Sequence, residues 1–145
     1  EDNALLNIAR KTRLNTLFDG QSEGFETRIH EGGAGLSGGQ RSLVGINRLI
    51  HSSPSVWILD EPTASLDLAS EVAVLETLDK AIRVDDIFIM ATHKVSLLER
   101  FNRVLIVKEG RIIKDAPSKS VIEEMQKISN SGSLVTTRLK GRNVS

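Results

Sequence analysis

The sequence predicts an α/β fold in which buried strands alternate with amphipathic helices. Two short, unbroken apolar runs at 56–59 and 87–91 are typical of strands buried on both faces, as in a parallel sheet. Between them, apolar residues recur at helical intervals from Leu68 to Ile82, behind Asp67 as a helix cap. Alternation of this kind favours a layered sheet with helices packed against it.

The other elements follow from periodicity and turn residues. Ser37 and Gln40 have the spacing of a capping box, and the helix behind them is expected to stop before Pro54. The remaining predictions are short helices over 3–18, an irregular segment over 19–35, a helical turn at 96–100, a β-hairpin of 104–107 with 112–113 across Glu109-Gly110, a last helix over 121–128 and a poorly ordered tail over 129–145.

Composition narrows the class of protein. The chain has 145 residues, of which 39% are hydrophobic and 26% charged, which is typical of one globular domain. Its 19 basic residues balance 19 acidic ones, and this neutrality argues against a nucleic-acid platform. The absence of cysteine excludes disulfides and thiolate metal sites. No apolar run approaches the ~20 residues that cross a bilayer.

Carboxylates and a histidine follow the two predicted strands. Asp60 and Glu61 end the first one, where an aspartate can hold Mg²⁺ and the neighbouring glutamate can accept a proton. His93 follows the second strand, where an imidazole can bind a γ-phosphate or orient a water. The alternatives are an acidic turn before Pro62 and a solvated histidine at a strand end.

The segment Leu36 to Gln40 is rich in glycine and opens a helix. The amino terminus of a helix offers N–H groups and partial positive charge, so it attracts anions. Gly38 and Gly39 allow close approach of a phosphate, and Ser37 can donate its hydroxyl. The alternative is a plain capping box with glycines that ease the turn.

Taken together, these motifs resemble those of the ATP-binding-cassette ATPases, the motor domains of ABC transporters. The matching segments, in the family's order, are Leu36-Ser37-Gly38-Gly39-Gln40 (signature), Val56-Trp57-Ile58-Leu59-Asp60-Glu61-Pro62 (Walker B), Ser65-Leu66-Asp67 (D-loop) and Thr92-His93 (switch histidine). The resemblance covers about residues 1–128. It implies part of a RecA-like P-loop core with a mostly parallel sheet, joined to part of a helical signature subdomain.

The resemblance also implies a role for each motif residue. Asp60 would serve Mg²⁺, Glu61 would polarise the attacking water, and His93 would contact the γ-phosphate of ATP. Asp67 would communicate across a head-to-tail dimer of two nucleotide-binding domains. The signature residues would bind ATP held by the opposite subunit; they are Ser37, Gly38, Gly39 and Gln40. The implied division is a helical subdomain over 1–52, the ATPase core over 53–128 and a flexible tail over 129–145.

The family's phosphate-binding loop is missing, because no lysine in the chain follows a glycine. The family places this loop upstream, so we expect a truncated domain that begins inside its helical subdomain; the alternative is a natural protein that has lost the loop. In the family's sheet, the strand before the loop lies between the strand ending at His93 and the strand at 104–107. We therefore expect unpaired edges, a local rearrangement or a strand-exchanged oligomer, and no ATP hydrolysis by these residues alone.

Within the family, the segment Glu31 to Gly35 resembles the corresponding segment of exporters rather than of importers. The segments 92–98 and 103–107 are similar to those of type I secretion and bacteriocin exporters. This subtype implies a membrane domain in the same polypeptide, a motor at the cytoplasmic face of the cell membrane, and export of a protein or peptide. The sequence departs from the family pattern at 45–48, and a tryptophan at position 57 is unusual in the Walker B strand. We interpret both differences as changes in packing rather than in catalysis.

Two other classes stay open. DNA-associated cassette ATPases of chromosome maintenance and repair share these motifs, but they would bring long coiled coils or a basic groove, and the sequence has neither. A non-catalytic remnant that only dimerises would have no need of Glu61 or His93.

Overall fold

The computed structural model describes residues 2–18, 35–127 and 135–137. Its internal contacts divide the chain into two compact units. The first comprises Glu1–Pro54 with Thr63–Arg83, and the second comprises Ser55–Pro62 with Val84–Ser145. Most of the irregular segment predicted over 19–35 lies outside the described residues.

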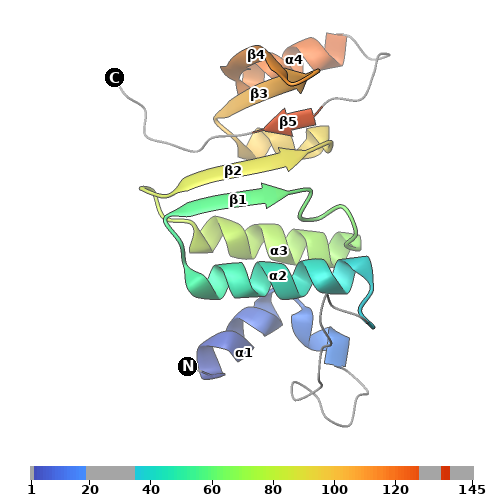
Figure 1. Ribbon diagram of the computed structural model, residues 1–145, viewed down its shortest axis with the longest axis vertical. Helices are drawn as coiled ribbons and strands as arrows, with labels where there is room; N and C mark the ends of the chain where they lie inside the picture. The colour runs from blue at the N-terminus through green and yellow to red at the C-terminus, as the bar shows by residue number, and fades with distance from the viewer. Residues whose placement is uncertain (1, 19–34, 128–134, 138–145) are drawn as a thin grey trace. The chain divides into compact units, whose positions relative to one another are not determined.

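The first unit is helical, and Figure 1 shows its helices α2 and α3 side by side. Its elements are α1 (Asp2–Lys11), the 3-10 helix η1 (Leu14–Phe18), α2 (Gly38–Ser52) and α3 (Leu68–Ala81). The helix predicted to stop before Pro54 ends at Ser52, and Ser53 follows in the left-handed conformation with φ 44°. Every helix predicted for this stretch is therefore confirmed.

A buried hydrogen-bonded pair joins the turn after α1 to α2 within the apolar core of this unit. Asn47 donates its amide to Thr12 Oγ1 at 2.7 Å and to the Leu43 carbonyl at 2.8 Å. Both polar side chains are almost fully buried, with Thr12 at 0% and Asn47 at 4% exposure. Asn47 lies in the segment that departs from the family pattern, and its contact is one of packing, as expected.

The second unit contains a five-stranded sheet in the order β1-β2-β5-β3-β4, visible in Figure 1. Its elements are β1 (Val56–Asp60), β2 (Ile87–Thr92), the 3-10 helix η4 (Val95–Arg100), β3 (Arg103–Lys108), β4 (Arg111–Pro117), α4 (Ser118–Lys127) and β5 (Val135–Thr137). All strands and helices predicted between 56 and 127 are present, so the α/β fold is confirmed.

The sheet is mixed in direction. β1 and β2 run parallel, whereas β5 runs antiparallel to both β2 and β3, and β4 is antiparallel to β3. It follows that β1, β2 and β3 share one direction. The two antiparallel strands are the return arm of the hairpin and a segment from the predicted tail.

The tail differs from the expectation at 135–137, which form β5, while the rest of 129–145 lies outside the described residues. Val-Thr-Thr is rich in β-branched residues, which favour strands. The facing edges of β2 and β3 also offer backbone groups that need hydrogen-bond partners. Three residues from the C-terminal part of the chain therefore lie in the interval where the sequence predicts unpaired edges.

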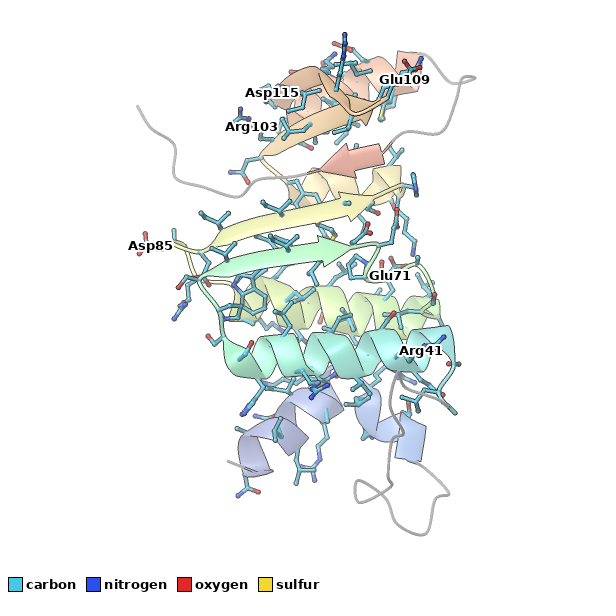
Figure 2. The ribbon with its side chains drawn as sticks, viewed as in Figure 1. Arg41, Glu71, Asp85, Arg103, Glu109 and Asp115 are labelled. Carbon is cyan, nitrogen blue, oxygen red and sulfur yellow. The ribbon has the colours of Figure 1, made fainter. Side chains whose placement is uncertain are left out.

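The hairpin of β3 and β4 turns at Glu109-Gly110, as predicted. Both residues have positive φ, 50° and 73°, which suits a two-residue turn. Arg103 of β3 forms a bidentate ion pair with Asp115 of β4, with 2.6 Å from Nε to Oδ1 and 2.5 Å from Nη2 to Oδ2 (Figure 2). The Arg103 guanidinium lowers the pKa of the Asp115 carboxyl.

One buried apolar cluster of the second unit forms where α4 and η4 meet the hairpin. Its four buried residues are Leu98, Val104, Ile106 and Val121. Trp57 of β1 is fully buried and donates its indole N–H to Asp86 Oδ2 at 3.2 Å, so the packing role expected for it is confirmed. None of the helices among the described residues is long and apolar enough to span a bilayer.

Candidate functional site

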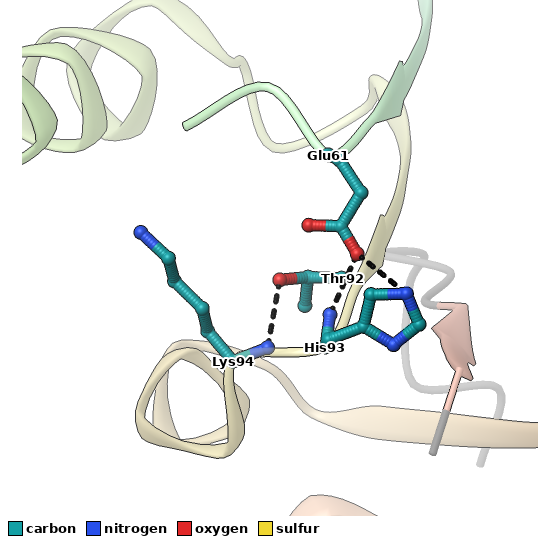
Figure 3. Close-up of polar contacts among 4 residues, drawn as sticks. All are labelled: Glu61, Thr92, His93 and Lys94. Atoms are coloured by element: carbon teal, nitrogen blue, oxygen red, sulfur yellow. Dashed lines mark hydrogen bonds and ion pairs between the residues drawn. The ribbon is translucent and has the colours of Figure 1, made fainter. Parts of the chain in front are cut away.

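The ends of β1 and β2 bring Glu61 and His93 together in the second unit (Figure 3). Because the two strands are parallel, with Asp60 paired to Ala91, the residues that follow them emerge at the same edge. Glu61 Oε1 accepts the backbone N–H of His93 at 2.8 Å and lies 3.3 Å from its Nε2. The sequence predicts both residues as catalytic, and the structure places them in direct contact.

The backbone of Glu61 is held in an uncommon conformation. Its φ is 44°, a value that a residue with a side chain rarely adopts. Its own N–H donates to the Ala91 carbonyl at 3.0 Å, which fastens the first residue after β1 to β2. Strained backbone of this kind is frequent at functional sites. The side chains remain accessible, since 29% of Glu61 and 54% of His93 is exposed.

Asp60 ends β1 with an exposed side chain. Among the residues the structure describes, no three acidic, histidine or cysteine side chains cluster as metal ligands do. Asp60 could supply one carboxylate oxygen to a cation. Mg²⁺ commonly binds in this way, through one or two carboxylates, phosphate oxygens and water.

The predicted signature residues form the first turn of α2 in the first unit. Ser37 Oγ accepts the N–H of Gln40 at 3.2 Å, and Gln40 Oε1 accepts the N–H of Ser37 at 2.8 Å. This reciprocal pair is a complete capping box, which fixes the entry of the chain into the helix. The Ser37 hydroxyl can still donate while its oxygen accepts, so capping and anion binding are compatible.

The glycines of this turn pack against the loop that contains Ser65. A Cβ added to Gly39 would lie 2.4 Å from the Ser65 carbonyl oxygen, and one added to Gly38 would lie 3.3 Å from Ser65 Oγ. Only glycine permits this approach of two backbones at position 39. The sequence explains these glycines by close approach of a phosphate to the backbone; the structure adds close packing of the glycines against the 65–67 segment.

Asp67 caps α3, as predicted. Its Oδ1 accepts the N–H of Ser70 at 2.9 Å and its Oδ2 accepts the Ser70 hydroxyl at 2.8 Å. These hydrogen bonds, led by the one from the Ser70 backbone, lower the pKa of the Asp67 carboxyl. The carboxylate is therefore ionised and positioned at the amino terminus of the helix, where negative charge is stabilised.

A cavity of about 230 Å³ lies where the signature turn meets the loop before α3. Four of the predicted binding residues line it, namely Ser37, Gly39, Gln40 and Asp67. Its other lining residues were not predicted from the sequence: Thr16, Leu43, Ser65, Leu66 and Ser70. Of these, Ser70 could have been found, because Asp67 and Ser70 have the spacing of a helix cap and its third residue.

The predicted site residues thus form two groups, one in each unit. Ser37, Gly39, Gln40 and Asp67 surround one cavity, and Gly38 lies in the same turn. Glu61 and His93 touch in the other unit, where Asp60 precedes Glu61 at the end of β1. The sequence analysis did not single out Thr63. Its side chain is 2% exposed, and its hydroxyl donates to Glu71 Oε1 at 2.7 Å. This hydrogen bond ties the turn after Pro62 to α3.

Comparison with known proteins places these motifs in a family. A family model described as ABC transporter matches residues 3–64. The ATP-binding protein HlyB for alpha-hemolysin translocation in Escherichia coli is 32% identical over 106 residues, covering 73% of this chain and 15% of that protein. The chain belongs to the ABC transporter family. The predicted resemblance to the nucleotide-binding domain of an exporter is thereby confirmed.

Other matches to this ABC transporter chain agree. The heterocyst differentiation ATP-binding protein HepA of Nostoc sp. is 31% identical over 121 residues, which are 83% of this chain and 20% of that protein. A bacterial Atm1-family ABC exporter solved with ATP bound shares the fold, with a TM-score of 0.76 at 22% identity over 92% of this chain and 24% of the other. The chain thus spans at most about a fifth of the curated relatives named here.

Proposed function

We propose that these residues are part of the ATP-hydrolysing motor of an ABC exporter, in which Glu61 accepts a proton from the attacking water. The observation that carries the proposal is the support of its carboxylate by His93, at 2.8 Å from the backbone N–H and 3.3 Å from Nε2. A carboxylate held in one position at the edge of a sheet can act as a base without a reorganisation cost.

His93 has a second role in this proposal. Its imidazole is about half exposed, so it can donate a hydrogen bond to a phosphate oxygen while its backbone N–H stays on Glu61. Phosphoryl transfer depends on positioning and on stabilising negative charge, and a donor at this point contributes to both.

Asp60 fits a Mg²⁺ ion that arrives with the nucleotide, because its exposed carboxylate ends the same strand that presents Glu61. The ion would neutralise charge on the phosphate oxygens. For Asp60 we propose only that it holds or orients this cation, directly or through water.

Ser37, Gly38, Gly39 and Gln40 are proposed to bind the γ-phosphate of ATP held by a second nucleotide-binding domain in a head-to-tail dimer. The amino terminus of α2 supports this assignment, because the first turn of a helix attracts anions, and Ser37, Gly39 and Gln40 line the cavity beside it. Asp67 borders the same cavity and is proposed to respond to dimer closure. We assign 1–52 to the helical subdomain and 53–128 to the core.

The membrane context is also a proposal. The matches to HlyB and to an Atm1-family exporter support a membrane domain in the same polypeptide, with this motor at the cytoplasmic face of the cell membrane. The role of HlyB in alpha-hemolysin translocation favours a protein or peptide as cargo. We further propose that the 145 residues alone do not hydrolyse ATP and can form a strand-exchanged oligomer.

The test uses the full-length protein that contains these residues. Glu61→Gln should reduce ATP turnover by at least ~10²-fold while ATP still binds, because the shape of the side chain is kept and the base is lost. Ser37→Ala should cost ~10²–10³ in turnover, by analogy with donors that stabilise a transition state. Glu123→Gln on the exposed side of α4 is the matched control and should leave turnover unchanged. Full turnover in Glu61→Gln would refute the assignment.

The isolated chain gives a separate test. Phosphate release from ATP by the 145 residues should equal the buffer background. Turnover that disappears in Glu61→Gln would show that the chain is active without a phosphate-binding loop, contrary to the proposal.

A further inference from the structure

The loop before α3 is closed by a buried hydrogen bond whose two residues lie outside the motif segments. The Thr63 hydroxyl donates to Glu71 Oε1 at 2.7 Å, across eight positions of the chain. Thr63 is 2% exposed, and Glu71 lies partly buried in the first turn of α3 (Figure 2). A hydrogen bond to a carboxylate is stronger than one between neutral groups, and the low dielectric of a buried position strengthens it. Glu71 therefore fixes the start of the loop to the helix that follows it.

The rest of this loop is held by hydrogen bonds within it. The Leu66 N–H donates to the Thr63 carbonyl at 3.3 Å, and the Glu71 N–H donates to the Asp67 carbonyl at 2.8 Å. Asp67 in turn caps α3. The segment 63–67 is thus anchored at both ends, by the side chain of Glu71 at its start and by the helix cap at its end.

Between these anchors, Ser65 packs against the signature turn. A Cβ added to Gly39 would lie 2.4 Å from the Ser65 carbonyl oxygen, so the two backbones are in close contact. The loop and the turn are walls of one cavity, to which the loop contributes Ser65 and Asp67 and the turn contributes Ser37 and Gln40. Close packing leaves few voids that could absorb a displacement of one wall. The position of Ser65 therefore affects the shape of the cavity.

We infer that Glu71 is a positioning residue for the signature turn, because its hydrogen bond to Thr63 holds the loop against Gly39. The cavity then keeps the shape in which Ser37 and Gln40 border it. The catalytic meaning of this inference rests on the proposed role of the signature residues in binding the γ-phosphate. Its geometric part, the link from Glu71 to the turn, does not depend on that role.

A purely structural role for Glu71 makes a different prediction. An acidic residue in the first turn of a helix stabilises that helix by its charge, with or without Thr63. Under that role, Thr63→Val would leave the signature turn undisturbed, whereas Glu71→Gln would weaken α3. Under the positioning role, Thr63→Val disturbs the turn and Glu71→Gln does not, because an amide oxygen still accepts the Thr63 hydroxyl.

The geometric part is tested by NMR of the full 145-residue chain, isotopically labelled. Thr63→Val and Glu71→Ala should each make the Leu66 amide exchange about fivefold faster, because one hydrogen bond fewer opposes opening of the turn. Both should also shift the amide resonance of Gly39. Thr63→Ser and Glu71→Gln keep the donor and the acceptor, so they should restore both signals to wild-type values. Glu76→Ala, on the exposed side of the same helix, is the matched control and should change neither signal.

Wild-type signals at Leu66 and Gly39 in both Thr63→Val and Glu71→Ala would overturn the inference. Each residue has its own pair of variants, so if Thr63→Val unfolds, the comparison of Glu71→Ala with Glu71→Gln decides, and the reverse holds. If both disruptive variants unfold, Glu71→Asp replaces them. Its side chain is shorter by one methylene, and it should disturb the same two amides; wild-type signals would again overturn the inference.

The catalytic part is tested by ATP turnover of the full-length protein. Thr63→Val should lower kcat about tenfold with little change in KM, because a misplaced group costs rate while another domain holds the ATP. Thr63→Ser should restore kcat. If Ser37→Ala lowers turnover and Thr63→Val does not, the positioning role is wrong and the proposed function stands. If neither variant lowers turnover, the proposed role of the signature residues fails, and the NMR comparison decides the link from Glu71 to the turn.

Discussion

The carboxylate of Glu61 receives the backbone N–H of His93 at 2.8 Å, 32 residues further along the chain. The contact exists because β1 and β2 are parallel neighbours whose ends lie at one edge. The contact positions Glu61, a candidate base, against His93, a candidate phosphate ligand. The choice of substitution at Glu61 separates the effect of this hydrogen bond on the backbone from the effect of the carboxylate on catalysis.

Glu61→Ala should raise the hydrogen-exchange rate of the His93 amide about fivefold, because the loss of one hydrogen bond costs about 1 kcal/mol. Glu61→Gln should leave that rate close to wild type, since its Oε1 can accept the same N–H. Two-dimensional NMR of the labelled chain measures both. Equal exchange in the two variants would show that the carboxylate does not hold this backbone.

Gly39 and Gly45 lie in the same helix, but replacing each of them with alanine is expected to change stability in opposite directions. Gly39→Ala should destabilise the first unit by about 1–3 kcal/mol, because its Cβ would lie 2.4 Å from the Ser65 carbonyl oxygen. Gly45→Ala meets nothing within 4 Å and should stabilise the helix by up to about 1 kcal/mol. Urea denaturation followed by circular dichroism gives both values, and shifts of the same sign would contradict the packing described.

The carboxyl of Asp67 should make the stability of the first unit depend on pH. Hydrogen bonds from Ser70 lower the pKa of its carboxyl below the ordinary value of 3.8, so the folded state favours the ionised form. The resulting stabilisation is complete above the unfolded pKa and is lost as the pH falls through the lowered, folded pKa. Asp67→Ala should therefore lower the free energy of unfolding more at pH 7 than at pH ~3.

Urea denaturation at the two pH values provides the comparison. Glu76→Gln, on the exposed side of the same helix, serves as the control and should show little change at either pH. A cost of Asp67→Ala that grows as the pH falls would contradict the sign of the effect.

Thr12 and Asn47 should be energetically coupled. Asn47→Ala removes two hydrogen bonds from a buried side chain and should cost about 2 kcal/mol of unfolding free energy. Combined with Thr12→Val in a double-mutant cycle, the coupling should be about 1 kcal/mol. Arg48→Ala, at an exposed neighbouring position, should change stability by less than ~0.5 kcal/mol. Additive effects of Thr12→Val and Asn47→Ala would show that the pair does not interact.

Local sequence determined most of the elements and both helix caps. The capping box of Ser37 and Gln40, the cap at Asp67 and the turn at Glu109-Gly110 depend on residues within a few positions of each other. Interactions over such short distances along the chain are fixed by side-chain chemistry and backbone preference, which is why the pattern alone predicts them.

The contacts between distant segments were decided by tertiary structure. The approach of Gly39 to Ser65 and the pair Thr12–Asn47 depend on how helices pack, which a sequence pattern does not specify. β5 is the clearest case. The polar, glycine-containing sequence around it predicts a poorly ordered tail, yet three residues of that tail enter the sheet. The reason is physical, because the backbone groups of β2 and β3 need partners, and that need arises only once the sheet has formed.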